Sequence, residues 1–372
     1  MRRIQIEEFL SHCKEGVLLD VRSPGEYNHA HIPGATSFPL FTDEERKVVG
    51  TAYKQQSRET AIKIGLDYFG PKMRGMVEEV EKILNSTGDS QSGTRNSKPE
   101  IFLYCWRGGM RSGAVAWLLN LYGFNVTVLA GGYKAFRNYV LKSFEQPLSF
   151  KILGGYTGSG KTEVLQQLKT IGEKTIDLEG IACHKGSAFG NINMPAQPTQ
   201  EMFENKLSFE LMATANEKQS LNLSLPFRGT GGIWLEDESQ RIGSVNIPIA
   251  FWNTMRNSPL YFLEIPFEER LVHIDEEYGC CDKEKLMDAI QRIKKRLGGL
   301  ETKNAIQYLE EGNTRECFRI LLHYYDKQYT KSLNNREGLP HLLTKINCEK
   351  VAVENATVVS QAEAASTYAG TN

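Results

Sequence analysis

The stretch FKILGGYTGSGKTEVLQQL, residues 150 to 168, decides the fold of the second half of the chain. An apolar run typical of a buried strand leads into a glycine-rich loop, and TEVLQQL then has the spacing of an amphipathic helix. The loop satisfies G-x-x-x-x-G-K-[ST] in the strand–loop–helix context that this pattern requires, so it predicts a diphosphate site. Backbone N–H groups would surround the anion, Lys161 would neutralise it and Thr162 could reach a magnesium ion. The predicted diphosphate-binding residues are Gly155, Thr157, Gly158, Ser159, Gly160, Lys161 and Thr162.

Acidic residues further along the chain are candidates for the same cleft. Glu236 and Asp237 end the buried strand expected in IWLEDES, residues 233 to 239. Asp177 and Glu179 lie in TIDLEG, at the expected end of a second strand. For each acid a solvated surface carboxylate is the alternative. The loop itself indicates affinity for a diphosphate, whatever is attached to that diphosphate.

The first half of the chain alternates between expected strands and helices. VLLDV (17–21), IFLYC (101–105) and VTVLA (126–130) are short apolar runs, and SGAVAWLLNLYGF between the last two has helical spacing. This order predicts a parallel sheet with crossover helices. A helical insertion is expected over residues 42–85, followed by a mobile surface loop with the sequence STGDSQSGTRNSKPE.

Composition limits the classes of protein to which the chain can belong. The chain has 372 residues, 40% of them hydrophobic, and no apolar run is long enough to span a membrane. The amino terminus lacks the apolar core of a secretory signal. Seven irregularly spaced cysteines favour a reducing cytoplasm over a disulfide framework, and no pair has zinc spacing. A net charge of −1 means that any contact with RNA must come from local basic patches.

The stretch YCWRGGMRSG, residues 104 to 113, predicts a reactive thiol. Cys105 leaves a strand and enters a glycine turn before a helix, a geometry that lowers the pKa of a thiol and holds an anion over it. A small core residue is the alternative for this cysteine. The expected anion cradle comprises Trp106, Arg107, Gly108, Gly109, Met110 and Arg111.

The spacing between Cys105 and Arg111 does not decide which group this loop binds. Five residues separate the two, which fits a C-x5-R phosphatase loop, whereas many sulfurtransferases have four. A larger cradle also suits an oxyanion such as selenophosphate.

Three stretches in order resemble the signatures of the rhodanese family: LLDVRSPGEYNHAHIPGA (18–35), YCWRGGMRSG and VLAGGYKAF (128–136). The resemblance implies a cysteine that carries sulfur as a persulfide. Ala30 departs from it, because many rhodaneses have glycine there. We therefore predict an α/β chain with two domains: an N-terminal rhodanese-like α/β domain with a helical insertion (1–145) and a C-terminal P-loop NTPase-like α/β domain with extra helices (146–355). A flexible tail is expected over 356–372.

The whole chain resembles the tRNA 2-selenouridine synthase family. The resemblance adds DEERKVVGTAYKQQSRETAIKIG (43–65) and WLEDESQRIG (234–243) to the two loops. It implies an enzyme that replaces the sulfur of 2-thiouridine, at the tRNA wobble position, with selenium from selenophosphate. It also implies prior S-geranylation from geranyl diphosphate, with selenium delivered through a selanylated Cys105. The implied partners are that tRNA and a selenophosphate-producing enzyme.

Candidate RNA contacts rest on a few cations and aromatic residues. Lys134 and Arg137 follow the glycines of VLAGGYKAF, and RIKKRLGG (292–299) gathers several cations. Trp106 or Tyr133 could stack on a splayed base. A solvated helix face and inward-packed rings are the alternatives. The rival functions are a C-x5-R phosphatase, a nucleotide-dependent sulfurtransferase and a non-catalytic sulfur-relay or tRNA-binding adaptor.

Overall fold

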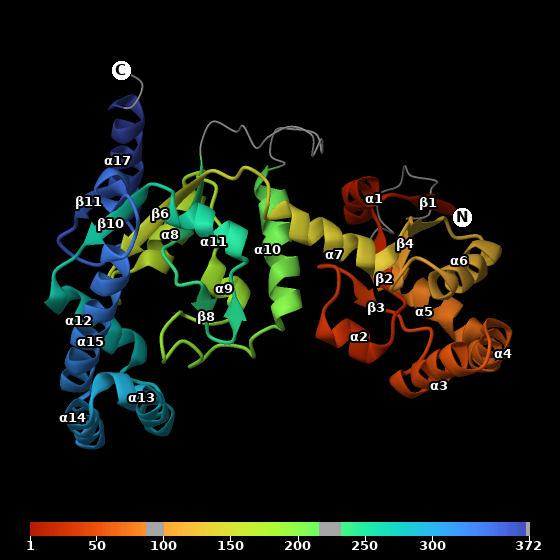
Figure 1. Cartoon of the computed structure of the whole chain (residues 1–372), viewed down its shortest axis with the longest axis horizontal. Helices are drawn as coiled ribbons and strands as arrows, with labels where there is room; N and C mark the ends of the chain where they lie inside the picture. The colour runs from red at the N-terminus through yellow and green to blue at the C-terminus, as the bar shows by residue number, and fades with distance from the viewer. Residues whose placement is uncertain (87–99, 216–231, 370–372) are drawn as a thin grey trace. The chain divides into compact units, whose positions relative to one another are not determined.

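The chain was analysed as a computed structural model, which describes residues 1–86, 100–215 and 232–369. It divides into two compact units, Met1–Ser143 and Phe144–Asn372, each with its own sheet and core (Figure 1). The loop expected at 86–100 lies almost wholly outside the described residues. Among the described helices none is long and apolar enough to cross a membrane.

The first unit is built on a five-stranded parallel sheet in the order β1-β5-β4-β2-β3, which confirms the predicted parallel architecture. Strands β2, β4 and β5 are buried along their whole length, as parallel strands covered on both faces must be. The strands are β1 (Arg2–Ile4), β2 (Val17–Asp20), β3 (Thr36–Ser37), β4 (Ile101–Tyr104) and β5 (Val126–Leu129). The helices outside the insertion are α1 (Ile6–His12), α2 (Pro24–His29), α6 (Met110–Tyr122) and α7 (Gly132–Ser143).

The insertion between β3 and β4 consists of three helices, α3 (Asp43–Gln55), α4 (Arg58–Phe69) and α5 (Met73–Ser86). Thr42 begins α3 with a capping box, in which its side chain accepts from the Glu45 N–H and the Glu45 side chain accepts from the Thr42 N–H. Helix α5 buries Met76, Val77 and Val80 in the core of the sheet, so the insertion is part of the fold.

The second unit has a four-stranded parallel sheet in the order β11-β10-β6-β7. Helices α8 (Lys161–Thr170) and α17 (Asn355–Ala369) pack on it, with Val164 and Val359 in one core with Trp234. The strands are β6 (Phe150–Gly155), β7 (Ile233–Glu236), β10 (Leu260–Glu264) and β11 (Leu343–Asn347), with a hairpin of β8 (Arg241–Ile242) and β9 (Val245–Asn246). Further helices are α9 (Leu178–Ala182), α10 (Gln200–Ala215), α11 (Ile249–Arg256) and α16 (Leu339–Leu342).

A second core in this unit is formed by helices alone: α12 (Phe267–Tyr278), α13 (Lys283–Leu297), α14 (Gly299–Glu310) and α15 (Thr314–Asn334). The segment from α14 to α15 is interrupted by a short turn that ends one helix and begins the next. Gly312 adopts φ +79°, a conformation that suits glycine, and the Asn313 side chain then accepts from the Glu316 N–H to begin α15.

Two further expectations are corrected by the structure. The tail from residue 356, expected to be flexible, forms most of α17, because Ala356 and Val359 find apolar partners and are fully buried. The strand expected in TIDLEG is reduced to a single bridge between Thr175 and Trp234, because Asp177 begins helix α9 immediately afterwards.

Candidate active sites

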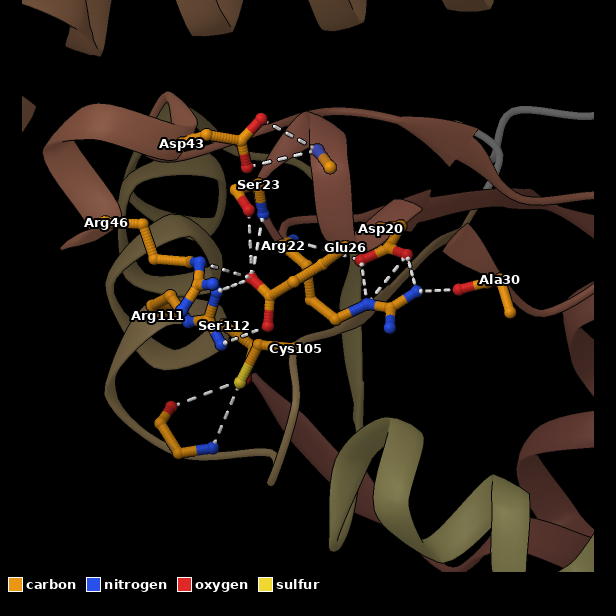
Figure 2. A network of polar contacts seen from close by, with 12 residues as sticks. Asp20, Arg22, Ser23, Glu26, Ala30, Asp43, Arg46, Cys105, Arg111 and Ser112 are labelled. Atoms are coloured by element: carbon orange, nitrogen blue, oxygen red, sulfur yellow. Dashed lines mark hydrogen bonds and ion pairs between the residues drawn. The ribbon is translucent and has the colours of Figure 1, made fainter. Parts of the chain in front are cut away.

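The Cys105 thiol lies at the junction of β4 and α6, where the Gly109 N–H donates to its Sγ at 3.3 Å. The Ser112 hydroxyl lies 3.2 Å from the same sulfur, and Cys105 is only 3% exposed (Figure 2). Burial alone would raise the pKa of Cys105. The hydrogen bonds from Ser112 and the charge of Arg111 outweigh that effect and bring the pKa below its usual value. The pKa of Cys105 is therefore shifted in the direction that makes a thiol more reactive.

Two glycines let the cysteine loop and α7 approach each other closely. Gly108 and Gly132 adopt φ +61° and +59°, and a Cβ on Gly132 would lie 2.2 Å from the Cys105 carbonyl oxygen. The first amides of α7 donate to the loop: Tyr133 N–H to Cys105 O at 2.8 Å and Lys134 N–H to Trp106 O at 3.0 Å. The glycines of VLAGGYKAF therefore hold the cysteine loop in place.

Arg111 does not point freely toward an anion over the sulfur. Its Nη1 and Nη2 donate to the two carboxylate oxygens of Glu26 at 2.7 and 3.3 Å (Figure 2). Arg46 from the insertion lies 3.4 Å from the same carboxylate. Arg111 is thus a partner of Glu26, its role in an anion cradle stays a prediction, and the Arg107 side chain is exposed.

The buried Arg22 side chain connects several segments next to the cysteine loop. Arg22 donates from Nε to Asp20 at 3.0 and 2.9 Å and from Nη2 to the Ala30 carbonyl at 2.7 Å (Figure 2). Its guanidinium group lies 3.8 Å from the ring centroid of Tyr133. Ala30 has φ −168°, extended backbone that any residue adopts, so the departure from glycine causes no strain.

The residues predicted to contact RNA separate into buried and accessible ones. Tyr133 is fully buried, so the prediction that it stacks on a base is wrong. Trp106 is 39% exposed with its ring centroid 5.8 Å from that of Tyr133, so a base can reach it. Met110 and Lys134 are exposed and Arg137 is half-buried. In RIKKRLGG, Lys294, Lys295 and Arg296 are exposed on α13, whereas Arg292 donates to Ala188 O.

The phosphate loop in the second unit follows β6 and opens α8, as the sequence predicts. Gly158 and Gly160 adopt φ +79° and +69°, which places the loop in a left-handed path available to glycine. Lys161 Nζ lies 3.3 Å from the Gly155 carbonyl. The Ser159 hydroxyl is buried and has no hydrogen-bond partner among the described residues.

A cavity of about 620 Å³ opens from this loop within the second unit. The polar part of its lining includes all the residues predicted to bind diphosphate, together with Glu179, Glu236 and Glu238. The apolar part comes from α12, α15 and the segment before α10: Phe189, Met194, Ile274, Tyr278, Phe318, Leu321, Leu322 and Tyr325.

Three carboxylates gather beside the phosphate loop. Oxygen atoms of Glu179, Glu236 and Glu238 all lie within 4.8 Å of one another. Burial, reinforced by the neighbouring carboxylate charges, raises the pKa of Glu179 to about 9, of Glu236 to about 8 and of Glu238 to about 7. Glu236 is 1% exposed, and its Oε1 has no partner in the described structure. Such a cluster suits a divalent cation or a shared proton.

All four acids predicted for the cleft line the cavity, but only two of them belong to the carboxylate cluster. Glu179 and Glu236 belong to the cluster, whereas Asp237 accepts from Tyr329 Oη at 2.6 Å and from Arg336 Nη2 at 2.7 Å. Asp177 caps α9 by accepting from the Gly180 N–H at 2.7 Å. Glu238 was missed by the sequence analysis, although extended backbone puts residues two apart on one face. That alternation could have grouped it with Glu236 and set Asp237 apart.

The cysteines of the chain are all free thiols, including the adjacent Cys280 and Cys281. Burial raises the pKa of Cys13 to about 11 and of Cys317 to about 12, so these two thiols stay protonated at neutral pH. Cys105 differs from them in having a lowered pKa.

Comparisons with known proteins cover both units. Residues 148–353 match the family described as the tRNA 2-selenouridine synthase AAA domain, and residues 5–139 match the rhodanese-like domain. Curated relatives that match most of the chain carry the name tRNA 2-selenouridine synthase. The one from Bdellovibrio bacteriovorus is 32% identical over 86% of this chain and 89% of its own length. Those from Pseudomonas fluorescens Pf0-1 and Marinobacter nauticus are each 33% identical over the same shares. The chain therefore belongs to the tRNA 2-selenouridine synthase family.

Proposed function

We propose that this chain is a transferase that converts 2-thiouridine at the tRNA wobble position into 2-selenouridine. The names of its relatives support the overall conversion. The chain would act in two steps: S-geranylation with geranyl diphosphate, then replacement of the geranylated sulfur by selenium from selenophosphate. A selenophosphate-producing enzyme would supply the second donor.

The cavity of the second unit is the observation that carries the first step. A phosphate loop and several apolar side chains line the same cavity, which matches a molecule with a diphosphate head and a hydrocarbon tail. The thiocarbonyl sulfur would attack C1 of geranyl diphosphate while the C–O bond breaks. The loop amides and Lys161 would stabilise the departing diphosphate.

The second step needs a site for selenium, and the Cys105 loop is our candidate. Its thiol has a lowered pKa, and exposed Arg107 offers an anion-binding donor beside it. The selenium of selenophosphate would form a bond to C2 as the C–S bond breaks and geranylthiolate leaves, and water would then cleave the Se–P bond and release phosphate. Exposed Trp106 would stack on the splayed base.

A magnesium ion fits the polar end of the cavity. The buried, unpartnered oxygen of Glu236 lies in a group of hard oxygen ligands of the kind that magnesium prefers. Thr162, Glu179, Glu236 and Glu238 would hold the ion, which would offset the charge of the diphosphate when bound. We expect Mg²⁺ to raise the midpoint of thermal unfolding of the wild type but not that of Glu236→Gln. Equal increases of the midpoint in both proteins would show that Glu236 does not bind the ion.

Mass spectrometry of nucleosides tests the division of labour between the two units. The protein is incubated with tRNA bearing 2-thiouridine, geranyl diphosphate and selenophosphate. Lys161→Ala should abolish geranylation, while Lys169→Ala, a change at an exposed lysine of the same helix, should leave it intact. Cys105→Ala should geranylate normally and form no 2-selenouridine, and Cys13→Ala is its matched control.

Specific outcomes of the same assay would overturn the proposal. Absence of both modified nucleosides with the wild-type protein rejects it outright. Turnover of a phosphoester without RNA would favour the phosphatase alternative, and nucleotide-dependent sulfur transfer would favour the sulfurtransferase. Loss of both steps in a folded Cys105→Ala protein would reject the separate roles.

A further inference from the structure

We infer that three aromatic side chains, Phe189, Tyr278 and Phe318, close the apolar end of the cavity and limit the transferred chain to two isoprene units. This inference rests on the proposed function and adds the residues that would set its specificity. All three line the cavity, and their exposed fractions are only 6%, 8% and 3%.

The apolar end begins directly at the phosphate loop. Gly158 packs so closely on α12 that a Cβ there would lie 2.7 Å from Ile274 Cγ1. Ile274 is therefore the first apolar residue that a chain leaving the loop would contact. Tyr278 follows four residues later on the same helix, one turn farther from the loop, a rise of about 6 Å.

The aromatic rings meet at that point from three different segments. The Tyr278 ring centroid lies 6.3 Å from that of Phe189 and 6.4 Å from that of Phe318, which comes from α15. All three belong to the core shared by α12, α13, α14 and α15. Buried side chains stand behind the rings, so the rings cannot retreat without disturbing a packed core.

The dimensions select the length of the chain. Each isoprene unit adds four C–C bonds, or about 5 Å of extended chain at about 1.5 Å a bond. Two units from the loop thus pass Ile274 and end against the rings. A third unit would have to displace a buried aromatic side chain, which is costly in a packed core.

Two of the polar side chains near the rings are already paired, which favours a hydrocarbon over a nucleobase. The Tyr325 hydroxyl accepts from the Ala188 N–H at 3.1 Å. Lys185, 5.5 Å from the Tyr278 ring centroid, forms an ion pair with Glu277. A base placed here would have to compete for these partners, whereas a prenyl chain needs none.

The test compares geranyl and farnesyl diphosphate as donors for the full-length protein. Wild type should prefer geranyl at least about tenfold in kcat/KM, since a poorly fitting apolar group costs discrimination of that order. Phe318→Leu should narrow this preference, and Phe318→Ala should narrow it further or reverse it. Phe251→Leu, a fully buried phenylalanine outside the cavity, is the matched control and should keep the wild-type ratio.

A second readout separates pocket shape from general damage. Inorganic diphosphate has no chain, so it should inhibit the wild type and the Phe318 variants equally. Wild type that transfers farnesyl as fast as geranyl overturns the inference even if no variant folds. Folded Phe318 variants with an unchanged ratio also overturn it, and the proposed function stands in both cases. Absence of any prenyl transfer by the wild type instead rejects the proposed function itself.

Discussion

At the scale of single residues, the reactivity of Cys105 depends on hydrogen bonds more than on the nearby arginines. Both Nη atoms of Arg111 donate to the carboxylate of Glu26. The charge of Arg111 lowers the pKa of the Cys105 thiol by less than the hydrogen bonds from Ser112 do. A hydrogen bond to a thiolate stabilises the charged form and lowers the pKa. Ser112 is therefore a positioning residue for this thiol.

Ser112→Ala should raise the pKa of Cys105, because it removes a donor to the thiolate while burial still opposes ionisation. Selenium transfer at neutral pH should slow and should recover as the pH is raised. The pKa is measured as thiolate absorbance near 240 nm, with Cys105→Ala subtracted. A variant with an unchanged titration would show that the loop amides alone hold the thiolate.

Residue identities predicted the position of the phosphate loop better than they predicted the orientation of individual side chains. The motif placed Lys161 and Thr162 in the loop correctly, since the glycine pattern fixes the backbone. The motif could not show that the Tyr133 ring packs against the guanidinium group of Arg22. It also could not show that the Asp237 carboxylate accepts hydrogen bonds from Tyr329 and Arg336. Those partners lie far away in sequence or fall in patterns that also suit exposed side chains.

At the scale of elements, the continuation of β7 determines the electrostatics of the cavity. Buried Glu236 and half-buried Glu238 and Glu179 form a close group in which full ionisation is unfavourable. Carboxyls in an unfolded chain ionise near pH 4. Because the folded pKa values are raised, the stability that this cluster contributes is fully present below that pH and declines as the pH rises.

The free energy of unfolding of the ligand-free protein should accordingly decrease as the pH rises to about 7 to 9, where the three carboxyl groups ionise. Glu238→Gln removes one charge and should flatten the decline, while Glu354→Gln, at an exposed position, should not. Urea unfolding in EDTA between pH 5 and 9 measures the slope. Parallel slopes for wild type and Glu238→Gln would contradict the coupling.

Elements with strong local patterns were predictable and those fixed by tertiary contacts were not. The strands VLLDV, IFLYC and VTVLA are continuous apolar runs, which suit a sheet covered on both faces. Gly312 and Asn313 mark the break between α14 and α15, because glycine commonly ends a helix and asparagine commonly caps the next one. The helical spacing of the apolar residues continues across this break. Helix α17 has few strong local signals, and its burial against α8 and β11 stabilises it.

At the scale of the whole molecule, two compact units lie on one chain. The sheets of the two units share no strand. The Cys105 loop belongs to the first unit and the phosphate loop belongs to the second. The sequence indicated this division because each half contains its own strand–loop–helix motif. A ligand specific to one unit should therefore stabilise that unit selectively.

Calorimetry should resolve two unfolding transitions, and geranyl diphosphate should raise only one of them. At a concentration of 100 times Kd the gain is about 2.7 kcal/mol, which for a unit of this size is a shift of about 5–10 °C. Lys161→Ala should abolish the shift, whereas Cys105→Ala should retain it. A single transition that moves as a whole would show that the two units unfold cooperatively.

The exposure of Trp106 also gives the Cys105 loop its own optical signal. The indole follows the thiol directly in the chain and remains 39% exposed. Selenium is a heavy atom, and heavy atoms near an indole promote intersystem crossing and quench its fluorescence. Subtracting the emission of Trp106→Phe would isolate this indole from Trp117, Trp234 and Trp252. Arrival and departure of selenium could then be followed in real time on unlabelled protein.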